Sequence, residues 1–207
     1  MPSWRCRGVG YRGLVSMAAG AAALTCSDFA LAHTGTGLAG GFALGFKHPF
    51  GGGDHLLAMT AVGLWGAILE APLIYALPIV FPMLMVVGAA LGMFGVSIPP
   101  VQIGVALSVL VLGCCIAIPF RAPVWMATLI VAAFALFHGY AHGKELPSAQ
   151  DPYGYSAGFV LATGLLHGLG ITIGLIARQP HGMAAMRTLG TVIAVTGVWF
   201  CYTAIHP

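Results

Sequence analysis

Long apolar runs, separated by short segments with proline, glycine or charge, dominate this sequence of 207 residues. An apolar stretch of about 20 residues is long enough to cross the hydrocarbon layer of a bilayer as a helix. Only 6% of the residues are Asp, Glu, Lys or Arg, against about 25% in soluble domains. Because so few charges cannot cover a surface that faces water, we expect an all-α, polytopic membrane protein.

The runs predict a bundle of six transmembrane helices. They cover 36–69, 73–95, 101–118, 124–143, 156–177 and 184–205. The first run is too long for one straight crossing, because a helix rises about 1.5 Å per residue and the hydrocarbon layer is about 30 Å thick. Pro49 and the three glycines that follow Phe50 predict a broken first helix, interrupted over 48–53. Asp54 is expected to cap the second half.

Glycines four residues apart predict close contacts between helices. Such pairs are Gly88/Gly92, Gly164/Gly168 and Gly170/Gly174.

Residues 1–32 have the three parts of a cleavable signal peptide. Three arginines within the first 12 residues precede the short apolar segment LVSMAAGAAAL, and a small-residue cleavage pattern ends at Ala32. We expect cleavage after Ala32, the alternative being an uncleaved anchor. Cleavage would make His33 the first residue, whose α-amine and imidazole together can bind one metal ion. The alternative for His33 is a solvated histidine at the chain end.

The arginines predict the orientation. Arg121 falls between the third and fourth helices, and Arg178 and Arg187 flank the connection between the fifth and sixth. With six spans, both connections lie on one side, which the positive-inside rule assigns to the cytoplasm. Both ends of the mature chain are then periplasmic, as expected for a protein of the bacterial inner membrane with a cleaved signal peptide.

Ionisable side chains near the predicted helix break are costly in lipid. A charged residue at the bilayer centre costs about 2.5–3.5 kcal/mol on insertion scales. His48, Asp54 and His55 flank the break, and His167 stands alone in the fifth helix. A single membrane histidine commonly forms a hydrogen bond between helices, and this alternative stays open for His167.

A second group lies at the end of the fourth helix. His138, His142 and Glu145 are spaced i, i+4 and i+7, which places them on one helix face. Imidazole and carboxylate ligands suit divalent nickel, cobalt, copper, zinc or iron. We therefore expect the two groups to converge around one cation. His181 is expected in a cytoplasmic loop and His206 in a solvated tail.

Two stretches, HPFGGGDHLLAMTAVG (48–63) and FHGYAHGKE (137–145), resemble the signature segments of the HupE/UreJ family. Members of that family are secondary nickel or cobalt permeases, found with hydrogenase and urease systems. The resemblance covers nearly the whole chain, although the run of three glycines departs slightly from the usual pattern. It implies a metal path that includes His48, Asp54, His55, His138, His142 and Glu145. His33 and His167 are added on their expected positions.

The sequence therefore predicts a permease that moves Ni²⁺ or Co²⁺ from the periplasm to the cytoplasm, and not an enzyme. No prosthetic group is expected, and the net charge of +3 is too dispersed for a nucleic-acid surface. One alternative is a membrane-embedded zinc hydrolase with Asp54 or Glu145 as the general base. Another is that the polar groups only hold helices together. The choice between nickel and cobalt, and between channel and carrier, stays open.

Overall fold

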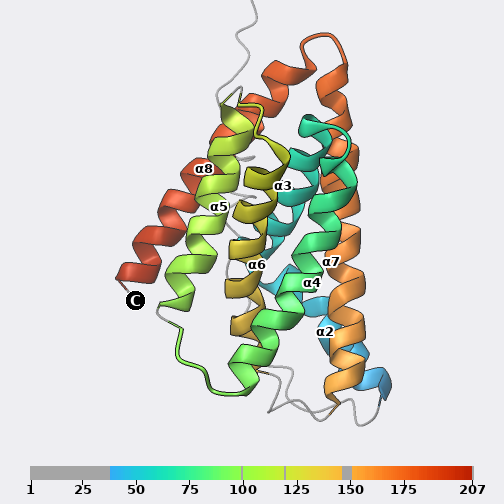
Figure 1. Cartoon of the computed structure of the whole chain (residues 1–207), viewed down its shortest axis with the longest axis vertical. Helices are drawn as coiled ribbons and strands as arrows, with labels where there is room; N and C mark the ends of the chain where they lie inside the picture. Colours follow the sequence, from blue (N-terminus) through green and yellow to red (C-terminus); the bar gives the residue numbers. More distant parts are fainter. Residues whose placement is uncertain (1–37, 99, 119, 146–150, 207) are drawn as a thin grey trace, which may run out of the picture. The chain divides into compact units, whose positions relative to one another are not determined.

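The structure, a computed structural model, describes residues 38–98, 100–118, 120–145 and 151–206. The signal peptide predicted at 1–32 and His33 lie outside these residues, as do the side chains of Leu38, Ala39 and Glu145. Within the described part the chain is all-α, as predicted (Figure 1).

Seven α-helices and one short 3-10 helix, η2, make up the described residues. They are α2 (Leu38–Gly51), α3 (Gly53–Leu69), α4 (Leu73–Met93), α5 (Val101–Ala117), α6 (Val124–Glu145), α7 (Pro152–Gly174), η2 (Leu175–Arg178) and α8 (Gly182–Ile205). The predicted bounds differ by at most four residues at either end. The difference is largest at α7, which starts early because Asp151 caps it and accepts a hydrogen bond from the Gly154 N–H at 3.0 Å.

The predicted break in the first span is confirmed, but it is confined to one residue. Gly52 is extended, with φ −111° and ψ 122°, whereas α2 continues through Pro49 to Gly51. The prediction that Asp54 caps α3 is wrong. Gly52 is the N-cap, because the chain becomes helical again directly after it. Asp54 is the second residue of α3, and its carboxylate accepts a hydrogen bond from the His55 backbone N–H at 2.8 Å.

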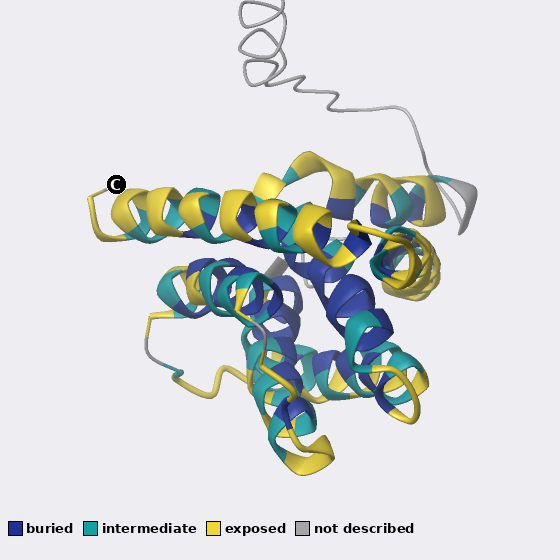
Figure 2. Cartoon of the chain, turned by 90° about the horizontal axis from the view of Figure 1, so that it is seen from above, coloured by how far each residue is buried: buried dark blue, intermediate teal, exposed yellow. Residues whose placement is uncertain are grey.

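The helices pack mainly as close pairs. α4 packs on α6, α5 packs on α8, and both α2 and α3 pack on α7 (Figure 1). α3 is the most enclosed helix, because nearly every residue from Ala58 to Ala67 is buried. Figure 2 shows the buried residues turned toward the interior of the bundle and the exposed residues turned outward.

Glycines allow backbone contact where α4 crosses α6. A Cβ atom added to Gly88 would overlap the Leu136 carbonyl, and one added to Gly139 would overlap the Met85 carbonyl. The backbones of α4 and α6 therefore touch at both glycines with no side chain between them, which is the geometry that glycine permits in membrane helices.

The predicted packing role of the glycine pairs is confirmed for two pairs of three. Gly88/Gly92 meet α6, and Gly170/Gly174 meet α3. For Gly164/Gly168 the prediction is wrong, because an added Cβ would have no neighbour within 4 Å at either position. These two glycines lie on the exposed face of α7.

Among the described residues, four helical segments are long and apolar enough to cross a membrane: α4, α6, α7 with η2, and α8. α3 and α5 are apolar but shorter, with 17 residues each. Large apolar side chains stand on the outer surface, for example Tyr75, Ile79 and Met83 on successive turns of α4. Lipid is the solvent that suits such a face. The chain is therefore a multi-pass membrane protein with four candidate spans.

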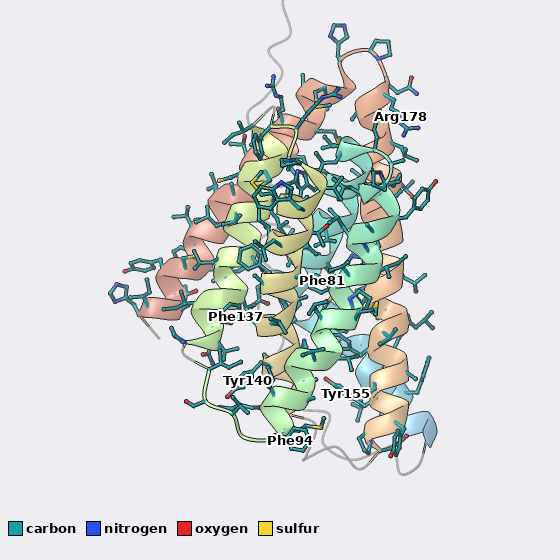
Figure 3. All side chains as sticks on the ribbon, viewed as in Figure 1. Phe81, Phe94, Phe137, Tyr140, Tyr155 and Arg178 are labelled. Carbon is teal, nitrogen blue, oxygen red and sulfur yellow. The ribbon has the colours of Figure 1, made fainter. Side chains whose placement is uncertain are left out.

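The two ends of the bundle differ in their connections. The α3–α4, α5–α6 and α7–α8 connections lie at one end, which Arg178 marks (Figures 1 and 3). Phe94 lies at the other end, where α5 begins and α6 ends (Figures 1 and 3). We call these the arginine end and the Phe94 end.

Candidate metal centre

Four of the predicted histidines lie against one another inside the bundle. They are His48 of α2, His55 of α3, and His138 and His142 of α6, and we call them the histidine cluster. The ring centroid of His142 lies 4.7 Å from those of His48 and His55, and His55 lies 4.8 Å from His138. His138 and His142 are 0% and 5% exposed. The structure thus brings the helix break and the α6 face together.

The break at Gly52 positions two members of the cluster. His48 lies in the last turn of α2 and His55 in the first turn of α3. In an unbroken helix, residues seven apart are separated by about 10.5 Å along the axis. The bend leaves the two ring centroids 6.2 Å apart.

Glycines position the other two members. Gly139 and Gly143 directly follow the two histidines of α6, and they lie against the backbone of Met85 and Ala89 in α4. Successive residues on a helix point about 100° apart. With the glycine face held against α4, the neighbouring face presents both imidazoles to the interior.

A hydroxyl group determines which His138 nitrogen carries the proton. The Ser108 Oγ donates its own hydrogen to the Val105 carbonyl, and it lies 2.9 Å from His138 Nε2. The oxygen must therefore accept from an Nε2–H. This leaves His138 Nδ1 with a lone pair, buried and without a hydrogen-bond partner in the described part of the chain.

A carboxylate likewise determines which His55 nitrogen carries the proton. Asp54 Oδ1 lies 2.9 Å from His55 Nδ1, so Nδ1–H donates to the carboxylate. His55 Nε2 is buried, and none of the residues that the structure describes forms a hydrogen bond with it. An imidazole that donates through one nitrogen to an acceptor and presents the other lone pair is the usual arrangement of a metal-binding histidine.

His167 is connected to the histidine cluster through one aromatic ring, that of Phe81. Its Nδ1 donates to the Met59 carbonyl at 2.7 Å, and its Nε2 is buried without a partner. The Phe81 ring contacts both histidines: its centroid lies 5.3 Å from that of His167 and 5.6 Å from that of His138. Figure 3 places Phe81 in the middle part of the bundle.

The other predicted residues lie away from the cluster or outside the described part. Glu145 is the last residue of α6, and its side chain is outside the described atoms. His33 is outside as well. His181 is exposed in the turn before α8, and His206 is exposed after its end, as expected for a loop and a tail.

The side chains do not form a ready-made coordination shell. Among the described residues, no group of three or more His, Cys, Asp or Glu side chains is arranged to hold a metal ion. Coordination by the histidine cluster would therefore need imidazole rings to turn. The predicted metal site stays a prediction.

Sequence reasoning missed the residues that surround the imidazoles. Ser108 is one, and its only signal is a hydroxyl within an apolar span. Phe159 lies 4.4 Å from His142 and Tyr155 lies 5.8 Å from His48, measured between ring centroids. Phe81 is the fourth. Aromatic residues are frequent in these helices, so nothing in the sequence distinguishes these three.

Apolar helices around buried imidazoles, several of which present a bare nitrogen, define a multi-pass membrane protein with a polar site inside the bundle. Residues 21–200 match the family described as HupE / UreJ protein. The chain is also 39% identical over 176 residues to Protein HupE of Rhizobium leguminosarum bv. viciae, an alignment that covers 85% of this chain and 92% of that protein. The chain therefore belongs to the HupE/UreJ family, which confirms the resemblance. No solved structure matches it.

Proposed function

We propose that this protein is a secondary permease that moves a divalent transition-metal ion, Ni²⁺ or Co²⁺, across the inner membrane toward the cytoplasm. The observation that carries the proposal is the histidine cluster, in which imidazoles from three helices meet away from lipid. Bare nitrogens at His55 and His138 support it, because imidazole lone pairs are ligands for such ions. Family membership supports it through the metal permeases that the signature segments resemble.

We propose six crossings, with α2 and α3 forming one of them. α5 has 17 residues and is about 26 Å long. This length is close to the hydrocarbon thickness of thinner membranes, which is about 27–30 Å. Arg121, Arg178 and Arg187 then mark the cytoplasmic side by the positive-inside rule. The Phe94 end is periplasmic in this arrangement.

Passage through the cluster requires ligands that exchange. A permeating ion must bind well enough to enter and weakly enough to leave, which favours several partial sites over one closed cage. In such a path each imidazole of the histidine cluster turns toward the ion as it passes. His142 lies one helical turn nearer the Phe94 end than His138, so an ion that enters from that end would reach His142 before His138. His167 would receive it beyond Phe81.

Metal uptake into proteoliposomes tests the proposal. Purified wild-type protein should transport ⁶³Ni²⁺ or ⁵⁷Co²⁺. His55→Ala and His138→Ala should each reduce the transport rate by about 100-fold, because the loss of a ligand costs more than the loss of a residue that only hydrogen-bonds to a ligand. His181→Ala is the matched control, because that exposed histidine lies outside the bundle. If the two variants keep wild-type transport, the cluster is not the path. Hydrolysis without metal movement would favour the enzyme alternative.

A further inference from the structure

A cavity of about 370 Å³ opens beside the histidine cluster, between α3, α5, α6 and α8. Its polar lining comes from Asp54 and His55 of α3, Gln102 of α5 and Thr203 of α8. Val101 of α5 and Ala204 of α8 also line it. Gln102 and Thr203 are exposed, whereas the His55 side chain is only 14% exposed. The cavity therefore runs from the surface to one member of the cluster.

The packing of α8 explains why the cavity is there. Gly190 lies against Ala117 of α5, and Gly197, two turns later, lies against Leu110. These contacts hold the two helices together. Two turns further on, the position equivalent to those glycines is Ala204, which lines the cavity instead. The cavity thus lies between the start of α5 and the last turns of α8.

The lining suits a hydrated cation. Asp54 contributes a carboxylate whose side chain is 35% exposed, and none of the described residues that line the cavity is Lys or Arg. Acidic clefts between low-dielectric walls concentrate cations. The volume is sufficient as well, because six waters of an octahedral hydrated ion occupy about 180 Å³ at about 30 Å³ each.

We propose that this cavity, the α5–α8 vestibule, is the entrance through which the hydrated divalent cation reaches His55. α8 is then one wall of the substrate path. The inference rests on the proposed transport function. In the vestibule the ion keeps its water while Asp54 attracts it, and Gln102 and Thr203 offer hydrogen bonds to that water. His55 lines the vestibule, and its Nε2, buried and without a hydrogen-bond partner among the described residues, is the first nitrogen that can replace a water molecule once the ion enters the cluster.

Blocking the vestibule with a thiol reagent tests the proposal. Single cysteines are placed at Val101 on the α5 wall and at Ala204 on the α8 wall, in a chain whose five native cysteines are changed to alanine. Ile205→Cys is the matched control, because Ile205 is next in sequence, 58% exposed, and not part of the lining. Right-side-out vesicles are treated with a positively charged, membrane-impermeant methanethiosulfonate, and ⁶³Ni²⁺ uptake is measured with the extent of labelling.

Labelling at either wall should reduce uptake by about tenfold, because a fixed cation then occupies the path. Excess Ni²⁺ should slow labelling at both positions. Ile205→Cys should keep its uptake, with or without labelling. Full labelling of both walls with normal uptake would overturn the vestibule, as would failure of the outside reagent to reach either wall. Absence of uptake by the untreated wild-type chain would instead overturn the proposed function.

A second pair of variants avoids cysteine replacement. Thr203→Trp fills the vestibule in the native chain, whereas Ile205→Trp adds the same bulk on the outer face of α8. Uptake should fall about tenfold for the first and stay at the wild-type rate for the second. Equal rates at equal protein abundance would overturn the proposal.

Discussion

The histidine cluster and His167 place the same chemical group in two different settings. In the cluster, rings from α2, α3 and α6 meet, and one of them, His55, lines an open cavity. His167 stands apart from the cluster and is 2% exposed. Its Nδ1 donates to the Met59 carbonyl, and its ring contacts that of Phe81. The comparison shows that a buried imidazole with a bare nitrogen is a common element of this bundle. What distinguishes the cluster is the number of rings and the position of one of them, His55, on a cavity that opens to the surface.

The largest effect that tests this comparison concerns metal binding. His142→Ala should weaken binding of Ni²⁺ to the purified protein by about 100-fold, because it removes the ring that contacts both His48 and His55. His167→Ala should leave binding within about threefold and lower the transport rate instead, since His167 acts after the cluster. Radiometal binding and proteoliposome uptake measure the two quantities. Equal losses of binding would remove the distinction between the two settings.

The next effect concerns the helix contact that orients the cluster. Gly139→Ala should destabilise the fold by about 1–3 kcal/mol, because the added methyl group overlaps the Met85 carbonyl. Gly164→Ala is the matched control, since it has the same chemistry at a glycine with open space beside it. Thermal denaturation of the purified variants compares them, with the loss of folded protein measured as the temperature rises. A Gly164→Ala variant as unstable as Gly139→Ala would contradict the packing described for α4 and α6.

A smaller effect concerns how each imidazole is held. Ser108→Ala should weaken Ni²⁺ binding by about tenfold, because Nε2–H of His138 loses its acceptor and the ring can change its proton position. Ser108→Thr, which keeps the hydroxyl, should restore most of the binding. No such variant exists for His167, whose acceptor is a backbone oxygen. If Ser108→Ala binds as the wild type does, Ser108 only fills space.

The smallest effect, and one common to both settings, is that of pH. Protons compete with metal for imidazole nitrogen, and free histidine is half protonated near pH 6.5. Uptake should therefore fall several-fold between pH 7.5 and pH 5.5, with the same sign for wild type and His167→Ala. Initial rates of ⁶³Ni²⁺ uptake at fixed free metal measure it. Faster uptake at the lower pH would indicate that histidine protonation does not oppose transport.

Much of the architecture was predictable because lipid imposes a simple rule. Backbone polar groups in a bilayer must be satisfied within each segment, so long apolar runs become helices. The predicted bounds of the helix at 124–143 and of α6 therefore differ by only two residues. The break was predicted from Pro49 and the glycines, but not its restriction to Gly52, because a helix tolerates proline when its neighbours accommodate it.

The candidate site was predictable in its ligands and not in its surroundings. His48, His55, His138 and His142 stand out because ionisable groups are rare in such helices. Ser108 and Phe159 do not stand out, since a hydroxyl and an aromatic ring are ordinary in a membrane span. Gly164 and Gly168 show the reverse error: the spacing of helix-packing glycines is present, but the pair faces outward.

By itself, the sequence determined the all-α membrane fold, the position of the break and the identity of the clustered histidines. Composition and local spacing suffice for these, because they depend on transfer into lipid and on helix geometry. Only the tertiary structure decided which imidazoles touch, which nitrogen of His55 and of His138 carries the proton, and that a cavity lies beside His55 between α5 and α8. Those features depend on contacts between segments far apart in the chain, and no local pattern encodes them.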